Sequence, residues 1–360
     1  MTTVDDRVVA ELPPPDTGSS AAADPVITVL LAASLRLGLL SSGLSALMLA
    51  GMLAFIVAKW HQGGPLGAPV IILVVIPLGY FGYFGYGCLR FARDWRICNG
   101  LLSTRAWRPV PAAMVTGRVV ELRAEPAAGQ QVRVTALPRC AAEVLARTGR
   151  AWVVGPEEPD GPMILRMDGF PACFVARPVR PRTGPPRWLP APAGTTGTAA
   201  DDPVTASLLA RIRRIRTVWL CAALGYAGLS LLVYRFGTTS LDKDFGSVFY
   251  PLALVVVLLC FARWQSYRRL NETYRAGPWT RVTVRIGSWQ ARWHGAAATR
   301  GTVHLADDRN LTITVTGASV AVLTAMERTG AVWLAGELRP GQTVIIGYPG
   351  YPLFGHARLS

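Results

Sequence analysis

The chain has 360 residues, of which 51% are apolar and only 16% are charged, whereas soluble proteins average about 25% charged residues. This composition excludes a disordered polymer, a collagen-like repeat and a disulfide-dense secreted mini-protein. The formal net charge is +15, and Lys59 and Lys243 are the only lysines beside a large excess of arginine. The low charge and the mean hydropathy of +0.31 favour an integral membrane protein.

The arginine excess, together with abundant Ala, Gly and Pro, is typical of high-GC coding sequences. In this respect the chain resembles uncharacterised integral membrane proteins of actinomycete-type, high-GC bacteria. The resemblance covers the whole chain, is compositional, and implies no activity. The six cysteines form no CxxC pair and no metal-ligand spacing, so we expect reduced thiols.

Residues 1–24 are predicted to be a disordered acidic tail, because acidic residues, a proline run and small residues dominate the segment. A secretory signal peptide is not expected, since the basic n-region is missing and the first apolar run begins too late.

Four uncharged apolar stretches follow, each about long enough to cross the bilayer core. They are Leu37 to Ala58, Pro65 to Leu89, Thr217 to Tyr234 and Phe245 to Ala262. Short turns join the first to the second and the third to the fourth, so we predict two transmembrane hairpins, at 25–92 and 201–262. A buried helical pair of a soluble protein is the alternative interpretation.

Arginines gather at one end of each predicted hairpin, whereas the turns at the other end are nearly neutral. Beside Arg36, these membrane-proximal residues are Arg90, Arg93, Arg96, Arg211, Arg213, Arg214, Arg216, Arg263, Arg268 and Arg269. The positive-inside rule then predicts a multi-pass protein of the cytoplasmic (inner) membrane with both termini cytoplasmic. Anionic lipid at the cytoplasmic face is the expected partner of these arginines.

Small residues recur along the first two predicted spans, where they would let another helix backbone approach closely. The predicted helix-packing residues are Ser42, Ala46, Ala50, Ala54, Ala58, Gly79, Gly82 and Gly85. The packing is expected either within one chain or between protomers, so a homo-oligomer is left open.

The chain contains an internal repeat, since four sequence blocks recur in the same order. Asp24-Pro25-Val26 recurs as Asp202-Pro203-Val204, Phe91-Ala92-Arg93 as Phe261-Ala262-Arg263, Arg147-Thr148-Gly149 as Arg328-Thr329-Gly330, and Phe170-Pro171 as Tyr351-Pro352. A tandem duplication explains this order. Each copy would be a hairpin and a soluble domain, and the copies would be parallel. Residues 182–200, rich in Pro, Gly, Thr and Ala, are predicted to be the linker.

The soluble segments, 93–181 and 263–360, alternate with a strand period, as in Val282 to Ile286 and Leu311 to Val315. Each is predicted to be a small β-barrel-like cytoplasmic domain in the order strand-strand-strand-helix-strand-strand. The fold class is therefore membrane α plus soluble β. This order weakly resembles the oligonucleotide/oligosaccharide-binding fold, a five-stranded barrel with its helix after the third strand. A membrane-anchored pleckstrin-like domain is the competing interpretation.

The repeated Arg-Thr-Gly triplets are predicted to end the two short helices, with Gly149 and Gly330 as left-handed caps. Arg147 and Arg328 would then lie at the negative ends of the helix dipoles. Trp152 and Trp333 are predicted to be barrel core rather than ligand platforms.

No catalytic, cofactor-binding or metal-binding motif is present in the sequence, so we expect no cofactor and no enzymatic activity. The leading hypothesis is a non-enzymatic, membrane-anchored scaffold or regulatory interaction module with an unknown protein partner. A channel or transporter component is the alternative, although the predicted spans contain no ionisable residue. Nucleic-acid or nucleotide binding by the basic barrels is the third hypothesis, but topology and lipid already account for many of those arginines.

Overall fold

The structure is a computed structural model that describes residues 14–61, 79, 86, 89–90, 92–123, 129–135, 137–155, 161–170, 172–181, 197–236, 240–292 and 295–360. The chain forms two compact units. One comprises Met1–Leu35, Asp94–Ala210 and Leu270–Ser360 and contains both β-domains. The other comprises Arg36–Arg93 and Arg211–Arg269, and its described residues are helical.

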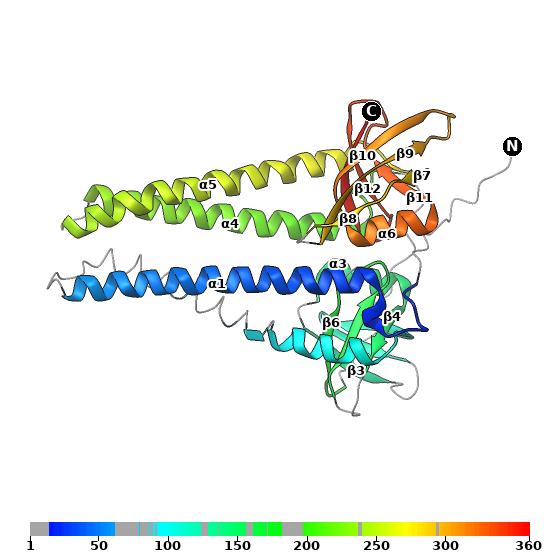
Figure 1. Cartoon of the computed structure of the whole chain (residues 1–360), viewed down its shortest axis with the longest axis horizontal. Helices are drawn as coiled ribbons and strands as arrows, with labels where there is room; N and C mark the ends of the chain where they lie inside the picture. Colours follow the sequence, from blue (N-terminus) through cyan, green and yellow to red (C-terminus); the bar gives the residue numbers. More distant parts are fainter. Residues whose placement is uncertain are drawn as a thin grey trace. The chain divides into compact units, whose positions relative to one another are not determined.

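Three long helices contain three of the four predicted spans. These are α1 (Pro25–His61), α4 (Pro203–Phe236) and α5 (Ser240–Arg275) (Figure 1). The second predicted span lies mostly outside the described residues, and a further helix covers 92–104. Within the described part of the chain, one helix is long and apolar enough to cross a membrane, the segment Pro203–Leu232 of α4.

The first β-domain is a closed six-stranded barrel in the order β1-β2-β3-β6-β5-β4, with β4 pairing back to β1 (Figure 1). Helix α3 (Arg139–Thr148) lies between β3 and β4. The strands are β1 (Arg108–Thr116), β2 (Val119–Leu122), β3 (Gln130–Val134), β4 (Arg150–Val154), β5 (Met163–Met167) and β6 (Phe174–Pro178).

The second β-domain closes in the same way, in the order β7-β9-β10-β13-β12-β11, and an extra short strand, β8, pairs with β9. Helix α6 (Val320–Thr329) again follows the third strand of the barrel. The strands are β7 (Trp279–Ile286), β8 (Gln290–Ala291), β9 (Ala296–His304), β10 (Asn310–Ser319), β11 (Ala331–Ala335), β12 (Thr343–Gly347) and β13 (Phe354–Leu359).

The strand registers of the two barrels match residue for residue, as a duplication predicts. Met163 pairs with Ala176 in the first barrel, and Val344 pairs with Ala357 in the second, an offset of 181 residues at both positions. The first strands, β1 and β7, also pair in the same register, but their offset is smaller. Pro111 of β1 corresponds to Thr283 of β7, an offset of 172 residues. The second copy therefore carries nine additional residues between its first two main strands, and β8 lies within them.

The predicted strand order was right except for the last strand of each domain, because the barrels have six strands and not five. Phe174, Val175 and Ala176 of β6 are all buried, so no polar side chain alternates with the apolar ones. A strand covered on both faces lacks the period-2 pattern that reveals a half-buried strand. In the second copy the corresponding strand, β13, is also short, with six residues against five in β6.

Two prolines in β1, Pro109 and Pro111, do not break the barrel. Ala112 donates its N–H to Gly149 at 2.9 Å on the β4 side, whereas the carbonyl of Pro111 accepts from Arg123 on the β2 side. The N–H groups that Pro109 and Pro111 lack would therefore point toward β2 and not toward β4. The pairing of β1 with β2 begins at Ala112, so that side is largely unpaired there. Proline is tolerated at such positions of a strand.

The segments before α1 and α4 are also repeated and ordered, which corrects part of two predictions. Ala21 donates its N–H to Arg105 at 2.7 Å, and Ala199 donates to Gly277 at 2.9 Å, so both copies make the same contact. Ala21 lies in the 3₁₀ helix η1 (Ala21–Ala23) and is fully buried. The predicted tail 1–24 and linker 182–200 thus each end in a packed segment, while residues 1–13 and 182–196 lie outside the described residues.

The first barrel buries its outer face as well as its interior. Trp152, Val154, Ile164 and Val175 form one hydrophobic cluster with Leu102, and the cluster also contains Ala21, Ile27, Cys98, Leu101 and Trp107. Trp152 pairs directly with Arg166, and Val154 with Ile164, so these side chains share one face of the sheet. Trp152 is buried as predicted, but beneath helical residues outside the barrel. The helix ends are therefore part of the core of the β-domain.

Both short helices end as predicted. Gly149 and Gly330 have φ of 63° and 62°, and each donates its N–H to the carbonyl four residues earlier, Leu145 and Met326 respectively. Glycine adopts this left-handed conformation without the penalty that a Cβ atom imposes.

The additional residues of the second copy contact α1 of the first copy. A Cβ atom on Gly295 would lie 3.2 Å from Leu30 Cδ2 and 3.4 Å from Ala33 Cβ. Gly341 has a similar positive φ, 86° against 78°, but nothing within 4 Å of the same position.

This difference predicts a graded effect of alanine at the two glycines. Gly341→Ala should lower the free energy of unfolding by about 1–2 kcal/mol through backbone strain alone. Gly295→Ala should lower it by about a further 1 kcal/mol, because the methyl group presses on α1. Thermal unfolding in detergent measures both, and equal losses would mean that the contact with α1 does not exist in solution.

Candidate functional site

The two aspartates of the repeated Asp-Pro motif cap their helices. Asp24 Oδ1 accepts from the backbone N–H of Val26 at 2.9 Å, and Asp202 Oδ2 accepts from that of Thr205 at the same distance. A side-chain acceptor at this position satisfies an amide that the helix leaves unpaired. The recurrence of the motif therefore has a local structural cause at both helix starts.

Each capping aspartate also forms an ion pair, but the two partners come from different places. Asp24 pairs with Arg166 of β5 in its own copy, at 2.8 Å. Asp202 pairs instead with Arg147, at the end of α3 in the first copy, also at 2.8 Å. The side chains of Arg147 and Asp202 are only 6% and 8% exposed, so the start of the second copy is held to the first barrel by a buried ion pair.

A substitution within the repeat explains this difference. The residue that corresponds to Arg166 in the second copy is Gly347, which has no side chain to reach Asp202. A Cβ atom on Gly347 would lie 3.0 Å from Trp279 Cη2, so the indole ring takes the space beside it. Tyr274 packs edge-on against the same ring at 5.8 Å between centroids, and burial raises the pKa of its hydroxyl well above the usual range.

Arg147 and its counterpart Arg328 therefore have different surroundings. The Nε and Nη1 atoms of Arg147 are buried and have no hydrogen-bond partner among the described residues. The buried positive charge of Arg147 is therefore balanced mainly by the carboxylate of Asp202. Arg328 is exposed. The predicted interaction of Arg147 with the helix dipole missed this ion pair, because spacing in the sequence does not reveal a partner 55 residues away.

The predicted membrane-proximal arginines lie mostly on exposed helix surface. Arg216 of α4 donates a hydrogen bond to the carbonyl of Arg263, which brings α4 and α5 side by side at this level. Arg268 lies over the ring of Trp264 at 5.3 Å. The exposed members of the predicted set are Arg90, Arg93, Arg96, Arg211, Arg213, Arg214, Arg263, Arg268 and Arg269.

The predicted helix-packing stripe is not buried where the structure describes it. Ser42 is half-buried and bonds to the Gly38 carbonyl at 2.7 Å, but Ala46, Ala50 and Ala54 are exposed. Gly79 is helical, and a Cβ atom added there would have nothing within 4 Å, while the Ala58 side chain, Gly82 and Gly85 lie outside the described part. A stripe of small residues is buried on α4 instead, at Ala223, Ala227 and Ser230.

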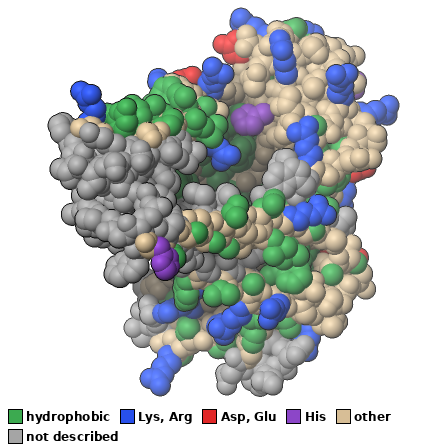
Figure 2. Space-filling view, turned by 60° about the vertical axis from the view of Figure 1, so that its left-hand side comes forward, with side chains coloured by type: hydrophobic (Ala, Val, Ile, Leu, Met, Phe, Trp, Pro, Cys, Tyr) green, Lys and Arg blue, Asp and Glu red, His purple; other side chains and the backbone are tan. Residues whose placement is uncertain are grey.

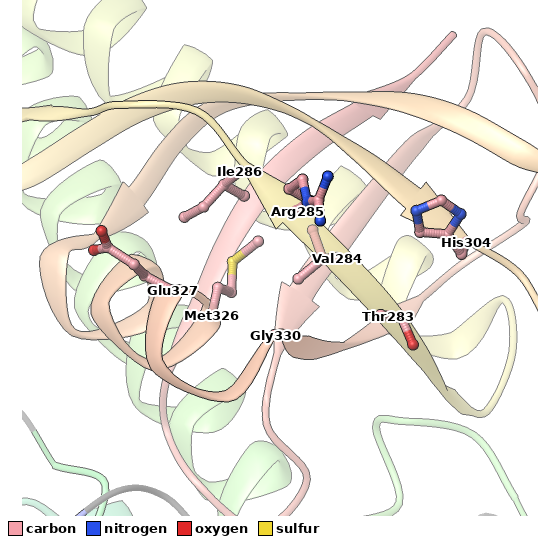
Figure 3. A pocket seen from close by; sticks show the side chains of 8 residues that line it. All are labelled: Thr283, Val284, Arg285, Ile286, His304, Met326, Glu327 and Gly330. Carbon is pink, nitrogen blue, oxygen red and sulfur yellow. The ribbon is translucent and has the colours of Figure 1, made fainter.

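The second barrel carries a groove of about 610 Å³ between β7, β9 and the end of α6. Its lining combines apolar Val284, Ile286 and Met326 with Arg285, Glu327 and His304, and is completed by Thr283 and Gly330. Figure 3 places Glu327 at the α6 side of the groove and His304 at the β9 side, with Arg285 between them. This volume is in the range of small-molecule ligand pockets. No motif in the sequence marked these residues as a site.

Arginine dominates the charged surface around the barrels. On the face seen in Figure 2, Lys and Arg side chains far outnumber those of Asp and Glu. Arg281, Arg285, Arg300 and Arg328 of the second barrel are all exposed.

The thiols of Cys98 and Cys173 are held protonated at neutral pH. Burial raises the pKa of each from 9.0 to about 12, and both pack on the outer-face cluster of the first barrel. Because burial disfavours the thiolate, these thiols leave the stability independent of pH below about pH 9 and lower it as the pH rises from 9 towards 12. These thiols are therefore poor nucleophiles in the folded protein.

Comparison with known proteins assigns no family to this chain, since no family model, curated protein or solved structure matches it. Among the residues that the structure describes, no three His, Cys, Asp or Glu side chains are grouped so that they could hold a metal ion.

Proposed function

We propose that the protein is a multi-pass protein of the cytoplasmic membrane, in which two helical hairpins hold two barrels at the cytoplasmic face. The barrels act as a non-enzymatic scaffold or regulatory interaction module. The observation that carries this proposal is the exposed apolar surface of α4 and α5, bounded at one end by arginine.

Large apolar side chains cover the outside of both helices. They are Val218, Trp219, Leu224, Leu231, Leu232, Leu254, Val255, Val256, Leu258, Leu259 and Phe261. An apolar surface of this length in water promotes aggregation, whereas in a bilayer it contacts acyl chains. The apolar segment of α4 supports one crossing directly, and the antiparallel course of α5 supports the return.

The arginines next to this apolar surface support an orientation. Arg211, Arg213 and Arg214 precede it on α4, and Arg268 and Arg269 follow it on α5, so all five lie at the end that leads to the barrels. Positive residues stay on the cytoplasmic side and attract anionic lipid there. Trp264, beneath Arg268, has the amphipathic character of aromatic residues at a membrane interface.

The attachment of the barrels supports a scaffold role. The first barrel shares its core with the helical residues around it, and the second copy is tied to it through Arg147 and Asp202. Two β-domains held by buried contacts present binding surfaces in a fixed arrangement, which suits the assembly of partners at a membrane.

Reporter insertion tests the topology. A reporter fused after Ser360 or inserted near Thr195 should indicate a cytoplasmic location. A reporter inserted at Gly63 or Thr239 should indicate a location on the external side of the membrane. The same location for the Gly63 and Thr195 reporters would contradict the proposal.

A further inference from the structure

Because the barrel is duplicated, the surface at the end of its short helix can be compared between the two copies. In the first barrel, the last turn of α3 carries Arg147, whose guanidinium holds the acidic start of α4 through Asp202. In the second barrel, the last turn of α6 carries Arg328 at the corresponding position, and Arg328 is exposed. A groove lies beside this turn, lined by Met326, Glu327 and Gly330.

The two barrels carry different residues at corresponding positions of this surface. Ala113 and Ala146 of the first barrel are buried, at 0% and 2% exposure. Their counterparts in the second barrel are Arg285 and Glu327, which are exposed and line the groove. The first barrel thus has small buried residues at two positions where the second barrel has charged residues that are accessible to solvent.

The charge of the open surface favours an acidic occupant. Arg285 and Arg328 are both exposed, and Glu327, the only acid in the groove lining, accepts a hydrogen bond from Trp289 Nε1 at 3.3 Å. The apolar floor of Val284, Ile286 and Met326 would receive aliphatic side chains of the same occupant.

We propose that the groove between β7 and α6 is a docking site for an acidic segment of a partner protein, with carboxylates beside Arg285 and Arg328 and an aliphatic side chain over Met326. The start of α4, with Asp201, Asp202 and Val204, exemplifies the chemistry of such a segment. This inference rests on the proposed scaffold function and gives the partner a chemical class.

A labelled peptide with the sequence of residues 197–209 serves as the probe, added to the full chain in detergent and followed by fluorescence anisotropy. Binding is expected to weaken about tenfold or more in the variant Arg285→Ala/Arg328→Ala, because charge-assisted hydrogen bonds are lost. It should also weaken with salt. A peptide with asparagine in place of both aspartates should bind as weakly as the intact peptide binds to the variant.

The matched control is Arg281→Ala/Arg300→Ala, which removes the same charge from exposed positions of the same barrel outside the groove lining. If peptide binding weakened equally in both double variants, it would depend only on the net charge of the barrel, and the assignment of the groove as the binding site would be wrong. Binding that is seen only after removal of residues 1–13 would assign the groove to the chain's own acidic start. Self-association lost in the groove variant would assign it to a second copy. Any of these outcomes overturns the partner assignment, while the reporter experiment on topology is unaffected.

Discussion

Replacing Asp202 by alanine is expected to lower the free energy of unfolding by about 3–5 kcal/mol, one of the two largest losses that we predict for a single substitution. The variant leaves the guanidinium of Arg147 buried without its carboxylate, and two of its nitrogens already lack partners among the described residues. It also removes the N-cap of α4. Thermal unfolding in detergent, followed by circular dichroism, measures the loss.

The duplication supplies the control for this prediction. Arg328 corresponds to Arg147 but is exposed, so Arg328→Ala should change the stability by less than about 0.5 kcal/mol. The pair Arg147→Met/Asp202→Ser removes both charges and keeps a capping hydroxyl, so it should recover most of the stability lost in Asp202→Ala. A double variant as unstable as Asp202→Ala would argue against the buried ion pair as the cause.

Leu102→Ala is expected to lower the free energy of unfolding by about 2–5 kcal/mol, because it leaves a cavity in the outer-face cluster of the first barrel. Leu102 is fully buried and packs in the cluster that contains Trp107 and Trp152. Leu89→Ala is the matched control, since Leu89 is 75% exposed. Its loss should stay below about 0.5 kcal/mol in thermal unfolding.

Equal losses at Leu102 and Leu89 would show that the helix over 92–104 does not pack on the barrel. The expected difference has a second consequence, which limited proteolysis can detect. In the Leu102→Ala variant, cleavage between this helix and β1 should become faster, because the segment around Arg105 is held by the same cluster.

The sequence predicted those parts of the fold whose pattern is local. Val282, Val284 and Ile286 alternate with exposed residues, so β7 has one face in the core and could be recognised. The caps Gly149 and Gly330 could be recognised because a glycine after a short amphipathic helix has one common structural role. The equivalence of the two copies also followed from the sequence, and the strand registers extend it across both barrels.

The rest depended on contacts between distant segments. Strand β6 lacks alternation, since its outer face is covered by helical residues that come 70 or more positions earlier, such as Leu102. The segment around Ala21 has the composition of a disordered segment. Ala21 is nevertheless buried, because it donates a hydrogen bond to the carbonyl of Arg105 and packs in the hydrophobic cluster. The groove of the second barrel joins residues of β7, β9 and α6 that share no motif.

The ion pair between Arg147 and Asp202 also sets an order of events during synthesis. Arg147 leaves the ribosome 55 residues before Asp202 does, an interval of about 3–11 s at usual translation rates. During this interval the first barrel has a cation without its carboxylate, and the next hairpin has not begun to form. Completion of the first domain therefore waits for the second copy to begin. The newly made chain should pass through a stage in which the first half is vulnerable to proteases, and stopping translation just before or just after Asp202 would make that stage visible.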